Sequence, residues 1–476
     1  MRSAEGGLFE RGDFIPICAC YESFLRNDDS LMRMTRFNLR FRVALLSALL
    51  FNLSSWAASR VEFVEYELPN GLHVILHQNN EAPVVSTYVL YHVGSKDERP
   101  DRTGFAHFFE HLMFEGTKNI ARGELDKLIK GSGGNFNAST SFDRTDYYIN
   151  VPSNELELAL WIESERMLHA VINEQGVETQ REVVKEERRS RYDNQPYGSF
   201  FENMAKMVFA DTPYAWTPIG SVQYIDQATI EEFRAFYKKW YVPNNAILSI
   251  AGDIDIENTK ALVEKYFADI SRGDEIGRAQ FAFELDASPQ ESEVIEPITP
   301  LPGTVHIWRA PPMTHEDANA LDLLINILAT GNSSRLYRKL VDLERAAVNS
   351  SAFTYLQEKA GMVAVFAIGN RGVDIAQLDE LIKTEVENLV ENGISDEEWQ
   401  KAMNIKEAEL ASSFGTMQNR AESLAYYRRW YGATDRINDE LDLYRNVTKE
   451  KIQEVARKYL TQERRYTLHY PVPEKR

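Results

Sequence analysis

Residues 103–117 read T-G-F-A-H-F-F-E-H-L-M-F-E-G-T, and this stretch decides how the rest of the chain is interpreted. Its apolar residues recur at helical spacing and give one buried face. Thr103 is a candidate N-cap, and Gly116 suits a left-handed stop. The stretch therefore predicts one short helix.

Three polar side chains interrupt the apolar face of this helix. His107 and His111 stand four residues apart and leave the same side, with Glu110 beside them. Two imidazoles so spaced can hold two positions of a tetrahedral zinc, and the carboxylate can take a proton from a water. The alternative is a pair of core histidines, but a Glu buried unpaired between them would be costly. We therefore interpret the pattern, His-x-x-Glu-His, as the inverse of the commoner zinc-protease order.

Length and composition bound the class of protein. A chain of 476 residues is too long for one ordinary core, so we expect two or more domains. Its 43% hydrophobic and 26% charged residues are typical of a soluble globular protein. The net charge of -19 excludes a nucleic-acid partner, because a phosphate backbone would be repelled.

The N-terminal segment resembles a targeting sequence. An apolar run, Val43–Leu53, follows three arginines and precedes small residues ending at Ala57 and Ala58; the arginines are Arg36, Arg40 and Arg42. This predicts a signal peptide over residues 34–57 and export, most simply to a periplasm, with residues 1–33 as an upstream extension. The run is short for a stable membrane span, and an uncleaved anchor is the alternative. Cys18 and Cys20 would be removed with it, which suits an oxidising compartment without demanding one.

Strand and helix patterns alternate through the first half of the chain. The turn Asn70-Gly71 predicts a hairpin of two strands, and further strands and helices follow around the motif. The predicted strands are Val61–Leu68, Leu72–His77, Val84–Val93, Asn135–Ser141, Asp146–Val151 and Ala246–Ala251. The predicted helices are Glu124–Lys130, Asn154–Ile172, Val177–Tyr192 (anchored by Val183 and Val184) and Thr229–Trp240.

A second half follows a segment without sustained periodicity. Residues 273–302 are acidic and rich in Pro and Ser, which predicts a linker. Beyond it we expect strands at Val305–Trp308, Asn349–Tyr355 and Met362–Ile368, and helices at Asp317–Ala329, Arg335–Arg345 and within Ile375–Tyr431.

The two halves contain a weak internal repeat. Thr229–Ile250 can be laid on Thr448–His469 at an offset of 219, which aligns Phe233 with Ile452 and Trp240 with Tyr459. The sequence thus predicts an α+β protein with two domains of similar build, residues 58–272 and 303–476. The second lacks His-x-x-Glu-His.

A zinc held by two histidines needs one more protein ligand, usually Glu or Asp. The charged segment Gln180–Arg189 offers acidic candidates, although such a helix is by default a solvated face. At this point the chain resembles the pitrilysin/insulinase family of zinc metallopeptidases, which includes the mitochondrial processing peptidases. That family places a Glu about 76 residues after the second His. Here 187 − 111 = 76 selects Glu187, with Glu186 as the near alternative.

The resemblance covers nearly the whole chain after the signal peptide. Further matching segments are Gly133–Ala138, Asp193–Gly198, Asn244-Asn245 with Gly252-Asp253, and Gly331–Tyr337. It implies two homologous domains, each a mostly antiparallel β-sheet packed with helices. It also implies one zinc ion held by His107, His111 and Glu187, with Glu110 as general base. Asn137 and Ala138 would pair with the substrate backbone as an added strand, so the implied substrates are extended or unfolded peptides.

Two departures from the family pattern bear on function. The family often carries an acid seven residues before the ligand Glu, and here Gln180 stands there, so tuning of the site by that charge is expected to be lost. Active single-chain members also carry an Arg and, seven residues on, a Tyr that stabilise the oxyanion. Those positions fall on Val341 and Val348, which cannot donate hydrogen bonds.

In lacking the Arg/Tyr pair, the chain resembles the two-chain members of the family, in which a homologous partner subunit supplies that pair. We therefore expect the metal-binding subunit of a heterodimeric zinc endopeptidase. The alternative is a non-catalytic peptide-binding or scaffolding subunit that keeps the fold, but such a protein has no need of Glu110 beside the metal.

Overall fold

The computed structural model describes residues 60–286 and 288–473, and from Val61 onward the chain forms one compact unit. The predicted signal peptide and upstream extension lie outside the described residues. Within the described part, the longest apolar helices fall short of what a membrane crossing requires.

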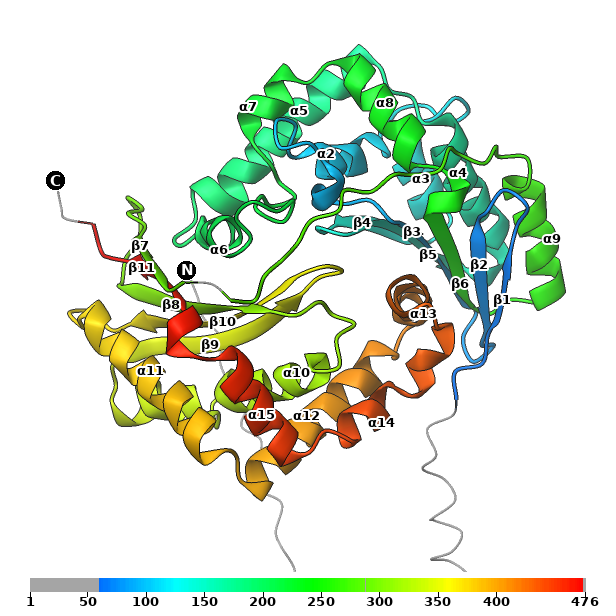
Figure 1. The fold of residues 1–476 in the computed structure, drawn as a ribbon. Helices are drawn as coiled ribbons and strands as arrows, with labels where there is room; N and C mark the ends of the chain where they lie inside the picture. The colour runs from blue at the N-terminus through cyan, green and yellow to red at the C-terminus, as the bar shows by residue number, and fades with distance from the viewer. Residues whose placement is uncertain (1–59, 287, 474–476) are drawn as a thin grey trace, which may run out of the picture. The chain divides into compact units, whose positions relative to one another are not determined.

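The first half is built on a six-stranded sheet in the order β1-β2-β6-β3-β5-β4 (Figure 1). Only the β2–β6 pair is parallel within this sheet. The hairpin predicted at Asn70-Gly71 joins β1 to β2. The strands are β1 (Val64–Glu67), β2 (His73–Gln78), β3 (Val84–Tyr91), β4 (Asn135–Thr140), β5 (Thr145–Pro152) and β6 (Ala246–Gly252).

The second half holds a five-stranded sheet in the order β7-β11-β8-β10-β9. Its single parallel pair is β7–β11. The strands are β7 (Gln290–Glu293), β8 (Gly303–Ala310), β9 (Ala347–Leu356), β10 (Gly361–Gly369) and β11 (Tyr466–Tyr470). β7 lies inside the segment predicted as a linker, and the predicted domain boundaries stay a prediction.

Both sheets repeat one topology, which confirms the predicted fold class. The order β6-β3-β5-β4 in the first sheet corresponds to β11-β8-β10-β9 in the second. Helices α8 (Ile230–Trp240) and α15 (Lys449–Tyr459) precede β6 and β11, and their bounds coincide at the offset of 219. The cap residues correspond too, because the side chains of Thr229 and Thr448 each accept a hydrogen bond from the third residue of their helix.

The remaining helices surround these sheets. In the first half they are α2 (Phe105–Leu112), α3 (Glu124–Gly131), α4 (Leu156–His169), α5 (Glu174–Arg188), α6 (Phe200–Val208), α7 (Val222–Gln227) and α9 (Ile256–Phe267). In the second half they are α10 (Ala318–Ala329), α11 (Ile375–Asn392), α12 (Asp396–Ser413), α13 (Met417–Tyr431) and α14 (Glu440–Arg445). The helix predicted at Arg335–Arg345 is a shorter π-helical segment, Tyr337–Leu343.

Each sheet is covered on one face by its own helices and on the other by a helix of the opposite half. On β3, Val89 and Tyr91 face a core shared with α2, α4 and α8, whereas Tyr88 and Leu90 pack with residues of α13. On the second sheet, Val305 and Ile307 pack with Met204 and Val208 of α6. The alternation of strand side chains thus joins the two halves through two separate apolar clusters.

The motif helix α2 is shorter than predicted and is capped differently. It starts after Gly104, which has a left-handed backbone (φ 93°), and ends at Leu112, before Gly116. Thr103 does not cap it, because its hydroxyl oxygen accepts from Ser221 N instead. Glu98 takes that role: its carboxylate accepts from Gly104 N at 2.9 Å and Ala106 N at 2.7 Å.

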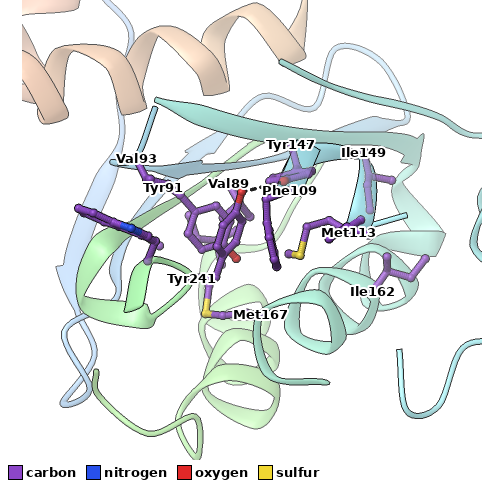
Figure 2. Packing of buried hydrophobic residues seen from close by; sticks show 14 of the residues in the cluster. Val89, Tyr91, Val93, Phe109, Met113, Tyr147, Ile149, Ile162, Met167 and Tyr241 are labelled. Carbon is purple, nitrogen blue, oxygen red and sulfur yellow. Dashed lines mark hydrogen bonds between the residues drawn. The ribbon is translucent and has the colours of Figure 1, made fainter. Parts of the chain in front are cut away.

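Aromatic packing fixes the orientation of α2. Phe233 of α8 stacks on both Phe105 and Phe108, with ring centroids 4.7 and 4.6 Å apart. Phe109 lies against Tyr241 at 4.6 Å, in the cluster drawn in Figure 2. Because these three phenylalanines face the core, the opposite side of α2 carries the two histidines and Glu110.

Candidate metal centre

The structure brings three of the predicted residues together. His107 and His111 of α2 point their Nε2 atoms at Glu187 of α5, with separations from Glu187 Oε2 of 3.6 and 3.3 Å. One ligand atom from each residue lies within 4.8 Å of the others, and no other such group of His, Cys, Asp or Glu occurs in residues 60–286 and 288–473. All three side chains are mostly buried, with exposures of 12, 22 and 16%.

Helix α5 presents Glu187 inward because of its buried face. Val184 is buried, whereas Val183, which we predicted as a second anchor, is 43% exposed. Glu186, the near alternative for the third ligand, points outward: its side chain is 67% exposed and pairs with Arg189. Helical geometry therefore distinguishes two adjacent glutamates that sequence spacing could not.

These donors fit a zinc ion by type and by spacing. Zinc–nitrogen and zinc–oxygen bonds of about 2.0–2.2 Å in a tetrahedron separate neighbouring ligand atoms by about 3.3–3.6 Å. The two His–Glu separations in this chain, 3.6 and 3.3 Å, are of that size. Two imidazoles and one carboxylate also leave one tetrahedral position for a water.

The electrostatics of the centre follow from burial and mutual charge. Burial, then the charge of His111, lowers the pKa of His107 to about 4. Burial also acts to lower the pKa of His111, but its hydrogen bond with Glu187 and the nearby carboxylates outweigh this and raise it. The same hydrogen bond holds the pKa of Glu187 below its ordinary value. Burial therefore favours the neutral, metal-binding form of His107, whereas the neighbouring carboxylates favour the protonated form of His111, with which a metal ion would compete.

Glu110 lies on the same helix and is connected to the edge strand. Its Oε2 accepts a hydrogen bond of 2.6 Å from the Thr140 hydroxyl at the end of β4. Burial raises the pKa of Glu110, against the lowering effect of this hydrogen bond. A carboxylate with a raised pKa is better matched to proton transfer near neutral pH. Thr140 was not predicted as a functional residue, although it stands two residues beyond Ala138 on the predicted strand.

Asn137 and Ala138 lie in the middle of β4. They pair with Tyr148 and Tyr147 of β5, and β4 is the last strand of its sheet, so its other edge carries no strand among the described residues. Asn137 is exposed, and Ala138 packs partly against the core that β3 shares with α2, α4 and α8. An open edge of this kind can accept an extended peptide through backbone hydrogen bonds.

Behind His111 stands a connection that the sequence did not reveal. The side-chain oxygen of Gln180 on α5 lies 3.1 Å from His111 Nδ1, and its NH₂ group donates to Glu115 at 2.5 Å. A carboxylate is thus present near His111 despite the amide at position 180. Glu115 stands four residues after His111, a spacing that was available as a signal.

The two valines that the resemblance aligns with the family's Arg/Tyr pair, Val341 and Val348, belong to the second half. Val341 packs partly against the apolar core formed by α10, α11 and α15 in the second half, and Val348 of β9 is 47% exposed. Neither side chain carries a polar atom. The chain's described residues therefore place three donors and a carboxylate together without an Arg/Tyr pair at those positions.

Comparison with known families gives consistent matches. Residues 73–220 match the profile of insulinase (peptidase family M16), and residues 227–406 match the peptidase M16 inactive domain. The zinc protease PqqE of Helicobacter pylori is 32% identical over 426 residues, which cover 86% of this chain and 94% of that protein. An uncharacterized zinc protease of Streptomyces coelicolor is 25% identical, covering 83% of this chain and 86% of its own length.

Solved structures show the same fold. A protease from Helicobacter pylori superposes with a TM-score of 0.82 at 29% identity, covering 86% of this chain and 99% of that one. The first half of the periplasmic protease PqqL from Escherichia coli gives a TM-score of 0.72 at 18% identity, covering 87% of this chain and 93% of that half. Against the longer PqqL chain the match covers 48% of its length.

Proposed function

The chain belongs to the insulinase family of peptidases, family M16, and we propose that it is a zinc endopeptidase that cleaves extended or unfolded peptides. The observation that carries the proposal is the group formed by His107, His111 and Glu187, in which both His–Glu separations suit a tetrahedral zinc, beside the carboxylate of Glu110. We assign one zinc ion per chain to this group.

Bound zinc would supply a Lewis acid for water and for the peptide carbonyl. The chain's own residues then have distinct tasks. Glu110 takes a proton from the attacking water and returns it to the leaving amine. Thr140 orients Glu110 through their 2.6 Å hydrogen bond. The free edge of β4 at Asn137 and Ala138 holds the substrate backbone in an extended conformation. Because this grip uses backbone hydrogen bonds, it depends little on the substrate's side chains.

The test is the substitution Glu110→Gln, assayed with a quenched fluorescent peptide and with an unfolded protein. Loss of the base should lower kcat by about 10²- to 10⁴-fold, while zinc content measured by mass spectrometry stays near one per chain. Glu186→Gln is the matched control and should leave both zinc content and cleavage unchanged. Undiminished cleavage by Glu110→Gln would exclude the assigned role of Glu110 as general base.

We further propose that a homologous partner subunit supplies the oxyanion donors. Support comes from Val341 and Val348, which lack donors, and from the length of the PqqL chain, of which this chain matches 48%. The experiment is to purify this chain with and without a homologue that has the Arg/Tyr pair but no His-x-x-Glu-His. Cleavage should rise about 100-fold or more on mixing, because a single oxyanion donor contributes about 10²- to 10³-fold to kcat. Equal activity of the isolated chain would refute the heterodimer.

Export is proposed from the sequence alone. The basic residues, apolar run and small residues before Ala58 support a signal peptide cleaved after Ala57. The intact mass of the protein recovered from its producing cell should correspond to a chain that begins at Ala58. A mature protein that begins at Met1 would exclude export by this route.

A further inference from the structure

We propose that Glu115 is a positioning residue for the metal centre, acting on His111 through the side-chain amide of Gln180. The inference rests on the proposed function, since it assumes that His111 is a metal ligand. It assigns a task to a carboxylate that neither binds the metal nor reaches the substrate edge. The three side chains come from α2, from the turn after it and from α5.

The directions of the hydrogen bonds follow from the end of the connection. The Glu115 carboxylate can only accept, so the group of Gln180 that lies 2.5 Å from it must be the NH₂. The carbonyl oxygen of Gln180 then faces His111 Nδ1 at 3.1 Å and can only accept in turn. Nδ1 of His111 must therefore carry the proton. In the neutral ring this leaves a lone pair on Nε2, the atom directed at Glu187.

Glu115 is itself held in place. Its side chain is 8% exposed and is ion-paired with Arg122, whose Nε and Nη2 both reach its carboxylate. It also packs on the first turn of α5, where a Cβ added to Gly176 would lie 3.4 Å from Glu115 Oε2. Because Glu115 is held from two sides, its carboxylate can in turn hold the flexible side chain of Gln180 in one orientation.

This connection accounts for Gln180 at the position where the family resemblance leads us to expect an acid. The negative charge is present but lies one hydrogen bond further from His111, on Glu115. Partners behind a metal-ligating histidine set its tautomer and raise its basicity, and their loss typically weakens metal binding about 10- to 100-fold. Gln180 transmits both effects because its amide donates on one side and accepts on the other.

The test compares zinc affinity, measured by competition with a chromophoric chelator, for four full-length proteins. Glu115→Gln removes the charge and should weaken zinc binding about 10-fold. Glu115→Gln combined with Gln180→Glu reverses the polarity: the new Gln amide can donate to the new carboxylate, which accepts from His111 directly. The double variant should bind zinc within about twofold of the original protein. Glu178→Gln, the same chemical change on an exposed position of α5, is the control and should have no effect.

The rescue separates positioning from a structural role. Both Glu115 variants leave Arg122 without its partner, so a role confined to that ion pair predicts equal loss in the single and double variants. That result would overturn the proposal, as would a zinc affinity of Glu115→Gln within twofold of the original. Failure of the proposed function is seen separately, because His107→Ala would then leave zinc binding and cleavage intact. Unfolding midpoints of all variants verify that each is folded.

Discussion

Among the side chains of β4, Thr140 alone donates a hydrogen bond to the proposed base, Glu110. Hydrogen bonds to charged groups contribute about 1.5–3 kcal/mol, and 1.4 kcal/mol is a tenfold change in rate. Thr140→Val keeps the shape of the side chain and removes the donor. We expect kcat to fall about 10-fold with zinc content unchanged. Thr140→Ser, which keeps the hydroxyl, should retain most of the activity, and equal losses in the two variants would contradict an orienting role.

At the scale of single residues, the sequence revealed what is local. His107, Glu110 and His111 lie within one helical turn of one another, so their common side follows from periodicity alone. Glu187 lies 76 residues further on, and the resemblance rather than geometry selected it. Thr140 and Glu115 were missed because their partners are set by how β4 and α5 pack on α2. Val183 was misjudged for the same reason, since only packing decides which valine faces inward.

The capping of α2 shows the same limit at the scale of an element. Thr103 has the residue type of an N-cap, but Glu98, five residues earlier, accepts from Gly104 N and Ala106 N. Trp216 Nε1 donates to the same carboxylate at 3.1 Å. An N-cap signal in sequence identifies a residue able to cap, whereas the folded chain determines which oxygen reaches the free amides. Strands and long helices with sustained apolar periodicity were predicted well, whereas β7, whose four residues are all polar and exposed, was not.

Removing this cap should destabilise the motif helix. Glu98→Ala leaves the backbone amides of Gly104 and Ala106 without this acceptor in a buried place, at a cost of about 1–3 kcal/mol, whereas Trp216 Nε1 keeps its bond to Ser95 O at 2.9 Å. We expect the free energy of unfolding, measured in urea, to fall by about 2 kcal/mol. The exposed Asp101, which pairs with Arg99, provides the control: Asp101→Asn should change stability by less than about 0.5 kcal/mol. A loss below that limit for Glu98→Ala would show that Glu98 does not cap α2.

Helices α8 and α15 allow a matched comparison between the halves. Phe233 stacks on two phenylalanines of α2, and Ile452, its counterpart at the offset of 219, is buried in the second core. Truncating either to Ala should cost about 3–5 kcal/mol for Phe and 2–5 kcal/mol for Ile. Only Phe233→Ala should also weaken zinc binding, because only it supports the helix with the histidines. Equal zinc affinities in the two folded variants would contradict this division.

At the scale of the molecule, the two halves share a topology and differ in what they place on it. Between β8 and β9, where the first half has α2 between β3 and β4, the second half has α10, whose residues are buried nearly all round. This mostly apolar helix keeps the core, and its one carboxylate, Asp322, is paired with Lys406 and accepts a hydrogen bond from Tyr444. Moreover, α6 and α13 each cover the sheet of the opposite half. The halves are thus similar in fold yet dependent on one another for burial.

A buried polar network also connects the two halves. Glu358, in the turn between β9 and β10, lies 2.7 Å from His92 Nε2 and 3.2 Å from Lys96 Nζ of the first half. Its backbone N donates to Asp143 at 2.9 Å, and Asp143 lies in the turn that ends β4, three residues after Thr140. The second half therefore holds the end of the strand that orients Glu110.

This network should make stability depend on acid. Burial acts to raise the pKa of Glu358, but the hydrogen bond from His92 and the charge of Lys96 outweigh it and hold the pKa well below the ordinary value. A depressed carboxyl pKa stabilises the fold above the unfolded-state value of about 4.3, and this contribution is lost as pH falls through the folded-state value.

Glu358→Gln should therefore lower the free energy of unfolding by about 1–3 kcal/mol at pH 7, and the difference should shrink below about pH 4. Urea titrations from pH 7 to pH 3 measure it, with the exposed Glu291→Gln as control. A deficit that stays constant over that range would mean that Glu358 acts through its shape rather than its charge, and the ionic connection between the halves would then contribute nothing to holding β4 in place.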